Sequence, residues 1–81
     1  MTTARSPVHA AFGNAVRELR RERGLSQEEL GHRSGLHRNY IGGIERGELN
    51  PTLTSIIKLA RAFEMRGSLL LQRAEALESE R

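Results

Sequence analysis

The sequence of 81 residues contains no cysteine. It therefore cannot form a disulfide framework and has no thiolate ligands for a metal. Its three histidines, His9, His32 and His37, are not spaced like zinc ligands with neighbouring carboxylates. We therefore expect no metal site and no cofactor.

Long apolar stretches are also missing. No hydrophobic run reaches the length that crosses a bilayer, and the N-terminal residues lack the apolar region of a secretory signal. We expect one small domain over residues 1–81, with residues 1–6 as a flexible N-terminus, that is soluble and cytoplasmic and has no membrane partner. An enzyme is not expected, because no nucleophile–base pair and no phosphate-binding glycine loop is present.

Positive charge is concentrated in the first half of the chain. Residues 1–46 hold eight arginines and five glutamates, whereas the remaining residues carry five charges of each sign. This excess suggests that the first half meets an anionic partner. Several of these arginines alternate with glutamates, so a solvated helix face explains any single one of them equally well.

Apolar spacing and capping residues predict five short helices and no strand. Ser6 and Pro7 begin the first helix, and Gly24 ends it. Ser26-Gln27-Glu28-Glu29 is a capping box for the second helix, which ends at Gly35. The remaining helices are predicted over residues 38–46, 53–63 and 68–78. The apolar residues expected to supply the core are Val8, Phe12, Val16, Leu19, Leu30, Leu36, Ile41, Ile44, Leu53, Ile56 and Phe63.

The stretch HRNYIGGIERG, residues 37–47, could be a helix or a tight hairpin. Gly42 and Gly43 each cost a helix interior about 1 kcal/mol relative to alanine, and Gly-Gly suits a two-residue turn. An isolated hairpin this short is unstable, however. On a helical wheel both glycines fall opposite the two isoleucines, so we predict a helix whose glycines face outward and let the backbone approach another surface. The alternative is that they relieve packing against a neighbouring helix.

The run LSQEELGHRSGLHRNYIGGIERGELNPTL resembles the helix-turn-helix of phage-repressor or Xre-like transcription regulators. The shared features are the opening Ser-Gln, the turn glycine, the Ile-Glu-Arg-Gly close and the Asn-Pro after it. The segment LHRNYIGGIERG is similar to the recognition helix of restriction–modification controller proteins, although Asn39 and Gly42 replace their usual threonine and serine. The resemblance implies an all-α, lambda-repressor-like five-helix bundle with its helix-turn-helix at residues 26–46 and double-stranded DNA as partner.

The resemblance also implies roles for individual residues. Arginine can pair with guanine and asparagine with adenine. His37 suits a helix cap as well as a contact, and Tyr40 suits partial burial as well as base reading. The implied base-reading residues are Arg38, Asn39, Tyr40 and Gly43. The implied contacts to the DNA backbone are Arg17, Gln27, His37, Arg46 and Asn50. The implied internal ion pair joins Arg20 to Glu45.

Residues 68–78 are predicted to form a dimerisation helix. Three consecutive leucines on a helix spread over about 200° and cannot all enter one core, and an exposed one usually contacts another chain. The alternative is that the outer leucine packs on Ile57 or near Leu49. A homodimer would set two recognition helices about 34 Å apart, as a palindromic operator requires. The predicted interface residues are Met65, Leu69, Leu70 and Leu71.

Two functions remain open on the sequence. The first is a controller-type transcription regulator that binds a palindromic operator as a homodimer, with RNA polymerase as a further partner. The second is an antitoxin or protein-interaction module that uses the same fold mainly to hold a partner. The outward positions of Arg38 and Asn39 favour the first.

Overall fold

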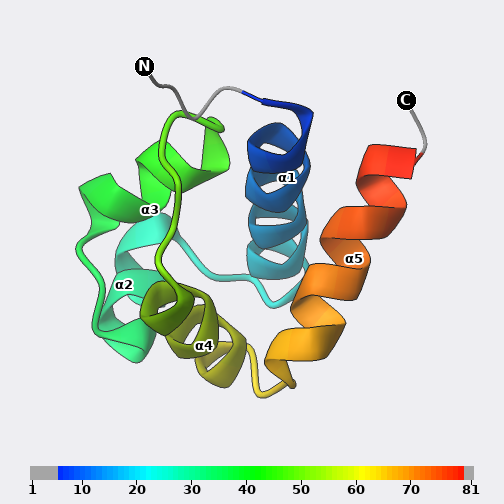
Figure 1. The fold of residues 1–81 in the computed structure, drawn as a ribbon. Coiled ribbons are helices and arrows are strands. Elements are labelled where there is room, and N and C mark those ends of the chain that lie inside the picture. The colour runs from blue at the N-terminus through cyan, green and yellow to red at the C-terminus, as the bar shows by residue number, and fades with distance from the viewer. Residues whose placement is uncertain (1–5, 80–81) are drawn as a thin grey trace.

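The structure, a computed structural model, describes residues 6–79 (Figure 1). Over that range the regular elements are all helices, which confirms the all-α prediction. Residues 1–5 of the predicted flexible N-terminus lie outside the described residues. No helix within 6–79 is long and apolar enough to span a bilayer. The helices are α1 (Pro7–Glu22), α2 (Gln27–Ser34), α3 (Arg38–Glu45), α4 (Leu53–Ala62) and α5 (Gly67–Ser79).

Local capping chemistry sets the ends of these helices. The Ser26 hydroxyl accepts the Glu29 N–H at 3.0 Å and the Glu29 carboxylate accepts the Ser26 N–H at 2.8 Å, which confirms the capping box. The hydrogen bond from the Ser26 backbone lowers the pKa of Glu29. Ser6 caps α1, as its place before Pro7 predicts, so it does not belong to the flexible segment predicted over residues 1–6, and Thr52 caps α4. Gly35 ends α2 with φ +79°, a conformation that favours glycine.

The core lies around α1, which stands between α5 on one side and α2 and α3 on the other (Figure 1). Two residues expected in the core are outside it, because Val8 is 56% and Leu53 73% exposed. Both lie in the first turn of a helix, at the edge of the bundle. The buried apolar cluster consists of Phe12, Ala15, Val16, Leu19, Leu25, Leu30, Ile41, Ile44, Leu59, Ala60, Phe63, Leu70 and Ala74.

Helix α1 rests directly on the last turn of α3 because of two glycines. A methyl group at Gly13 would collide with the carbonyl oxygen of Ile44 and lie 2.8 Å from that of Glu45. Gly47 follows α3 with φ +74°, and a methyl group there would lie 3.2 Å from Cα of Ala10. The C-terminal end of α3 therefore lies directly against the backbone of α1.

The three leucines of α5 have different environments. Leu70 is fully buried, so its assignment to a dimer interface is wrong. Leu69 is 48% and Leu71 42% exposed, as the helical spread of three consecutive residues requires. Met65 is half-buried and packs against the core. Of the four predicted interface residues, Leu69 and Leu71 are therefore the ones most open to a partner chain.

Candidate nucleic-acid interface

Helix α3 runs through both glycines, so the helix prediction for this stretch is confirmed. Its inward residues Ile41 and Ile44 are buried in the core. Arg38 and Asn39 are exposed at its N-terminal end. Arg38 Nη1 lies 3.7 Å from Glu28 Oε2, but both side chains are more than half exposed, so this pair is weak and readily exchanged for another partner.

The neighbours of this exposed pair are engaged within the chain. His37 Nδ1 accepts the backbone N–H of Asn39 at 3.0 Å, so His37 is the N-cap of α3. Tyr40 is half-buried, and its hydroxyl lies 3.0 Å from the Ser55 hydroxyl on α4. Of the two roles predicted for Tyr40, partial burial is the one that the structure shows. Its hydroxyl already has a hydrogen-bond partner in Ser55.

Glu45 anchors the other end of α3 to α1 and α2. Its carboxylate is 1% exposed and meets Arg20 at two points, Nε–Oε2 at 2.7 Å and Nη2–Oε1 at 3.0 Å. Gln27 on α2 donates its Nε2 to the same Oε1 at 3.0 Å. The hydrogen bonds to Glu45 raise the pKa of Arg20 above its ordinary value. The ion pair implied by the resemblance is present, and it fixes α3 against two other helices.

Arg17 and Gln27, two of the predicted contacts to a DNA backbone, both make hydrogen bonds to Glu45 within the chain. Arg17 Nη2 donates to the backbone carbonyl of Glu45 at 2.9 Å. This bond satisfies a free carbonyl at the C-terminus of α3 and places a positive charge at the negative end of the helix. The Gln27 N–H group faces Glu45, so its amide oxygen lies beside Gly42. Both side chains therefore hold α3 in place.

Neither glycine of α3 lies on an open surface, so the outward exposure predicted for them is wrong. A methyl group at Gly43 would lie 2.5 Å from Cδ1 and 2.9 Å from Cγ of Leu49. A methyl group at Gly42 would lie 3.1 Å from Nη1 of Arg46 and 3.5 Å from Oε1 of Gln27. Gly43 is covered by the α3–α4 loop, which removes the geometric basis for assigning it to base reading.

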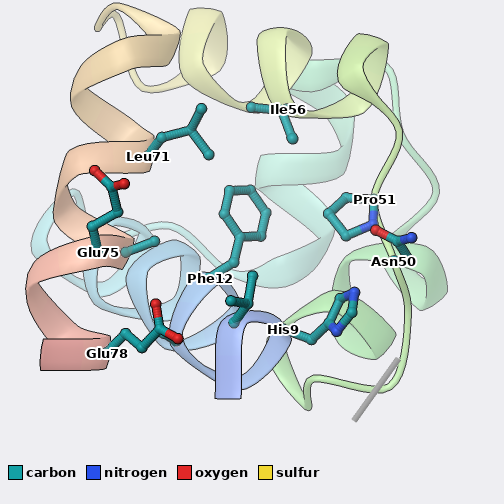
Figure 2. A pocket seen from close by; sticks show the side chains of 11 residues that line it. His9, Phe12, Asn50, Pro51, Ile56, Leu71, Glu75 and Glu78 are labelled. Atoms are coloured by element: carbon teal, nitrogen blue, oxygen red, sulfur yellow. The ribbon is translucent and has the colours of Figure 1, made fainter. Parts of the chain in front are cut away.

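The remaining predicted backbone contacts, Arg46 and Asn50, lie after α3 and are exposed. Arg46 Nε is 3.1 Å from Oε2 of Glu48, and its side chain is 57% exposed. Asn50 borders an apolar groove, beside Pro51 and near His9 (Figure 2). These two side chains remain available to a nucleic-acid backbone.

The predicted residues fall into two groups, one exposed and one bonded within the chain. The exposed group, available to a ligand, consists of Arg38, Asn39, Arg46 and Asn50. The bracing group behind it consists of Arg17, Arg20, Gln27 and Glu45. Two residues that support this arrangement, Gly13 and Leu49, were not singled out for it from the sequence. In the sequence, the small residues Ala10 and Gly13 on one helix face could have indicated a close helix contact. The apolar Leu49 in a polar loop could have indicated a packing role.

Known proteins share this fold and much of this sequence. Residues 16–70 match the helix-turn-helix family. The control protein C.SmaI of Serratia marcescens is 50% identical over 58 residues, which cover 72% of this chain and 69% of that protein. The control protein C.BamHI of Bacillus amyloliquefaciens is 38% identical over 65 residues, which cover 79% of this chain and 80% of that protein.

Two solved structures of controller proteins superpose closely. The restriction–modification controller protein C.AhdI from Aeromonas hydrophila gives a TM-score of 0.75 at 48% identity, covering 76% of this chain and 94% of that one. The controller protein C.Esp1396I gives a TM-score of 0.85 at 26% identity, covering 94% and 99%. The chain therefore belongs to the helix-turn-helix family of DNA-binding transcription regulators, and its relatives include the controller proteins of restriction–modification systems.

Proposed function

We propose that this protein binds a palindromic operator as a homodimer and reads its sequence with α3. The proposal rests on the difference between the two ends of α3: its N-terminal end is polar and exposed, and its C-terminal end is held by other helices. Arg38 and Asn39 are exposed at the N-terminus of α3, and Glu45 near its C-terminus is held by α1 and α2. A helix held in this way can enter a major groove in one defined orientation.

The exposed side chains have the chemistry that base and backbone recognition needs. Arg38 can donate two hydrogen bonds to guanine, and Asn39 can pair with both edge groups of adenine. Arg46 and Asn50 would contact the sugar–phosphate backbone, with His37 as a further contact from the helix cap. Such backbone contacts fix the register of the protein on DNA, while the first two residues select the sequence.

The proposed dimer interface is the apolar surface beside α5. Leu71 and the exposed Val8 border a groove of about 290 Å³, around which Leu71, Phe12 and Ile56 lie (Figure 2). Exposed apolar surface of this kind is usually covered by another chain. A second copy related by a two-fold axis would cover the Leu71 side of the groove, across from Asn50 (Figure 2), and pair the two recognition helices. Leu69 lies about 200° around α5 from Leu71 and points away from this groove.

The restriction–modification context is proposed from the relatives. C.AhdI and C.Esp1396I are named as controller proteins of such systems. By extension, this protein would control the genes of a restriction–modification system, with RNA polymerase at the regulated promoter as a second partner.

Selection of bound duplexes from a random pool tests the proposal. The native chain should enrich a palindrome. Arg38→Ala should bind the best site about 1–3 kcal/mol more weakly and lose preference at one base pair of each half-site. Arg46→Ala should weaken binding to all duplexes evenly and reduce the salt dependence by about one phosphate. A native chain that enriches no sequence, or an Arg38→Ala variant with unchanged preference, would refute sequence reading by α3.

A further inference from the structure

We infer that Leu49 is a positioning residue for DNA binding, because its side chain fills the space above Gly43 and fixes the α3–α4 loop, residues 46–52, on the recognition helix. The inference rests on the proposed DNA-binding function. It also assigns a reason to Gly43, the glycine in α3 that would otherwise only weaken the helix.

The loop leaves α3 through a tight turn that aims Leu49 back at the helix. Gly47, at φ +74°, donates its N–H to Ile44 at 2.9 Å, and Glu48 donates its N–H to Gly43 at 3.0 Å. These are the two hydrogen bonds of a Schellman motif, which an apolar contact beyond the turn commonly accompanies. Leu49 makes that contact here, one residue later than usual.

The Leu49 side chain occupies the space that a side chain at Gly43 would need, so Leu49 would have to shift to admit one. Cδ1 of Leu49 would lie 2.5 Å from a methyl group at Gly43, and Cγ would lie 2.9 Å from it. Leu49 itself is 36% exposed, so most of its side chain is covered although it sits in a surface loop. The absence of a side chain at Gly43 therefore lets Leu49 pack against α3.

The middle of the loop, at Leu49 and Asn50, is not held by hydrogen bonds to the described residues. At its far end Thr52 caps α4 and bonds Ser55. Between Glu48 and Thr52, neither Leu49 nor Asn50 makes a hydrogen bond to any described residue. Packing therefore sets the course of the chain here, and Leu49 supplies the contact to α3. Asn50, a proposed DNA-backbone contact, directly follows Leu49 in the chain, so its position depends on the packing of Leu49 against Gly43.

An exchange of side-chain size between the two positions tests the inference. Gly43→Ala pushes a methyl group against Leu49, and Leu49→Ala removes the side chain that packs on Gly43. The double variant places a methyl group in the space that the leucine occupied. Each single variant should bind the selected palindrome and a scrambled duplex more weakly by the same factor, about five- to tenfold. The double variant should bind at least as well as the better single variant. Leu53→Ala, a loss of the same size at an exposed leucine, should bind like the native chain.

Three results would overturn the inference. They are native affinity in Leu49→Ala, losses that multiply in the double variant, and a changed base preference in Gly43→Ala, which would place Gly43 at the bases. A readout without DNA separates this failure from failure of the proposed function. Hydrogen exchange at the Glu48 amide should be faster than native in both single variants and recover in the double variant. Unchanged exchange in Leu49→Ala would refute the claim that Leu49 fixes the loop on α3, even if the native chain bound no specific duplex.

Discussion

Arg20 on α1 and Glu45 on α3 form a two-point ion pair, with contacts of 2.7 Å and 3.0 Å, between residues 25 positions apart in the chain. The Arg20 side chain is 12% exposed and that of Glu45 is 1% exposed, so water screens this pair little. Loss of either partner leaves the other charge in a poorly solvated place. The pair therefore holds the C-terminal end of α3 against α1.

Glu45→Ala should lower the free energy of unfolding by about 3 kcal/mol, because it strands the Arg20 guanidinium and frees the Gln27 amide. The double variant Arg20→Ala/Glu45→Ala should lose less than the sum of the two single losses. Urea denaturation of the four proteins measures both quantities. Strictly additive losses would mean that the two residues do not depend on each other.

Gly13→Ala should destabilise the fold by about 1–3 kcal/mol, because the added methyl group meets backbone carbonyl oxygens that cannot rotate away. Gly42→Ala is the matched control, since its methyl group meets only the ends of the Arg46 and Gln27 side chains. That control should be close to native or slightly more stable, through its higher helix propensity. Thermal unfolding compares them, and a native melting temperature for Gly13→Ala would disprove the close α1–α3 contact.

Leu71→Glu should convert the proposed dimer to a folded monomer, because Leu71 borders the groove that a second copy would cover. Leu69→Glu, on the opposite flank of α5, should weaken association less. Leu70→Ala should instead unfold more easily by about 2–5 kcal/mol, since Leu70 is fully buried. Sedimentation at micromolar concentration and thermal melting distinguish these outcomes. A Leu71→Glu variant that associates like the native chain would remove the groove from the interface.

The ends of the helices could be predicted because they depend on residues close together in the chain. Ser26 and Glu29 complete a capping box within one turn, and Gly35 supplies the positive φ at which α2 ends. The same local signals sufficed for the all-α fold. The resemblance to a known family added the Arg20–Glu45 pair, which periodicity alone does not specify.

The partners of side chains between elements could not be predicted from spacing. A helical wheel places Gly43 opposite the core-facing isoleucines, but it carries no information about a loop that returns over the helix with Leu49. The same holds for Arg17, whose partner is a backbone carbonyl 28 residues away. Tyr40 likewise finds its partner on another helix, Ser55. Each of these contacts depends on the tertiary arrangement, so spacing alone could not show that Arg17 and Gln27 also contact Glu45.

Affinity as a function of the distance between two half-sites tests most directly the claim that two copies of α3 read one palindrome. Half-sites obtained by selection are placed on duplexes at increasing separations and titrated with the native chain. Binding should be tightest when their centres are about one helical turn, roughly 10 base pairs or 34 Å, apart. An added half turn should weaken it by about tenfold or more, because the second α3 then faces the wrong side of the duplex. Equal affinity at every separation, or for a single half-site, would contradict the account.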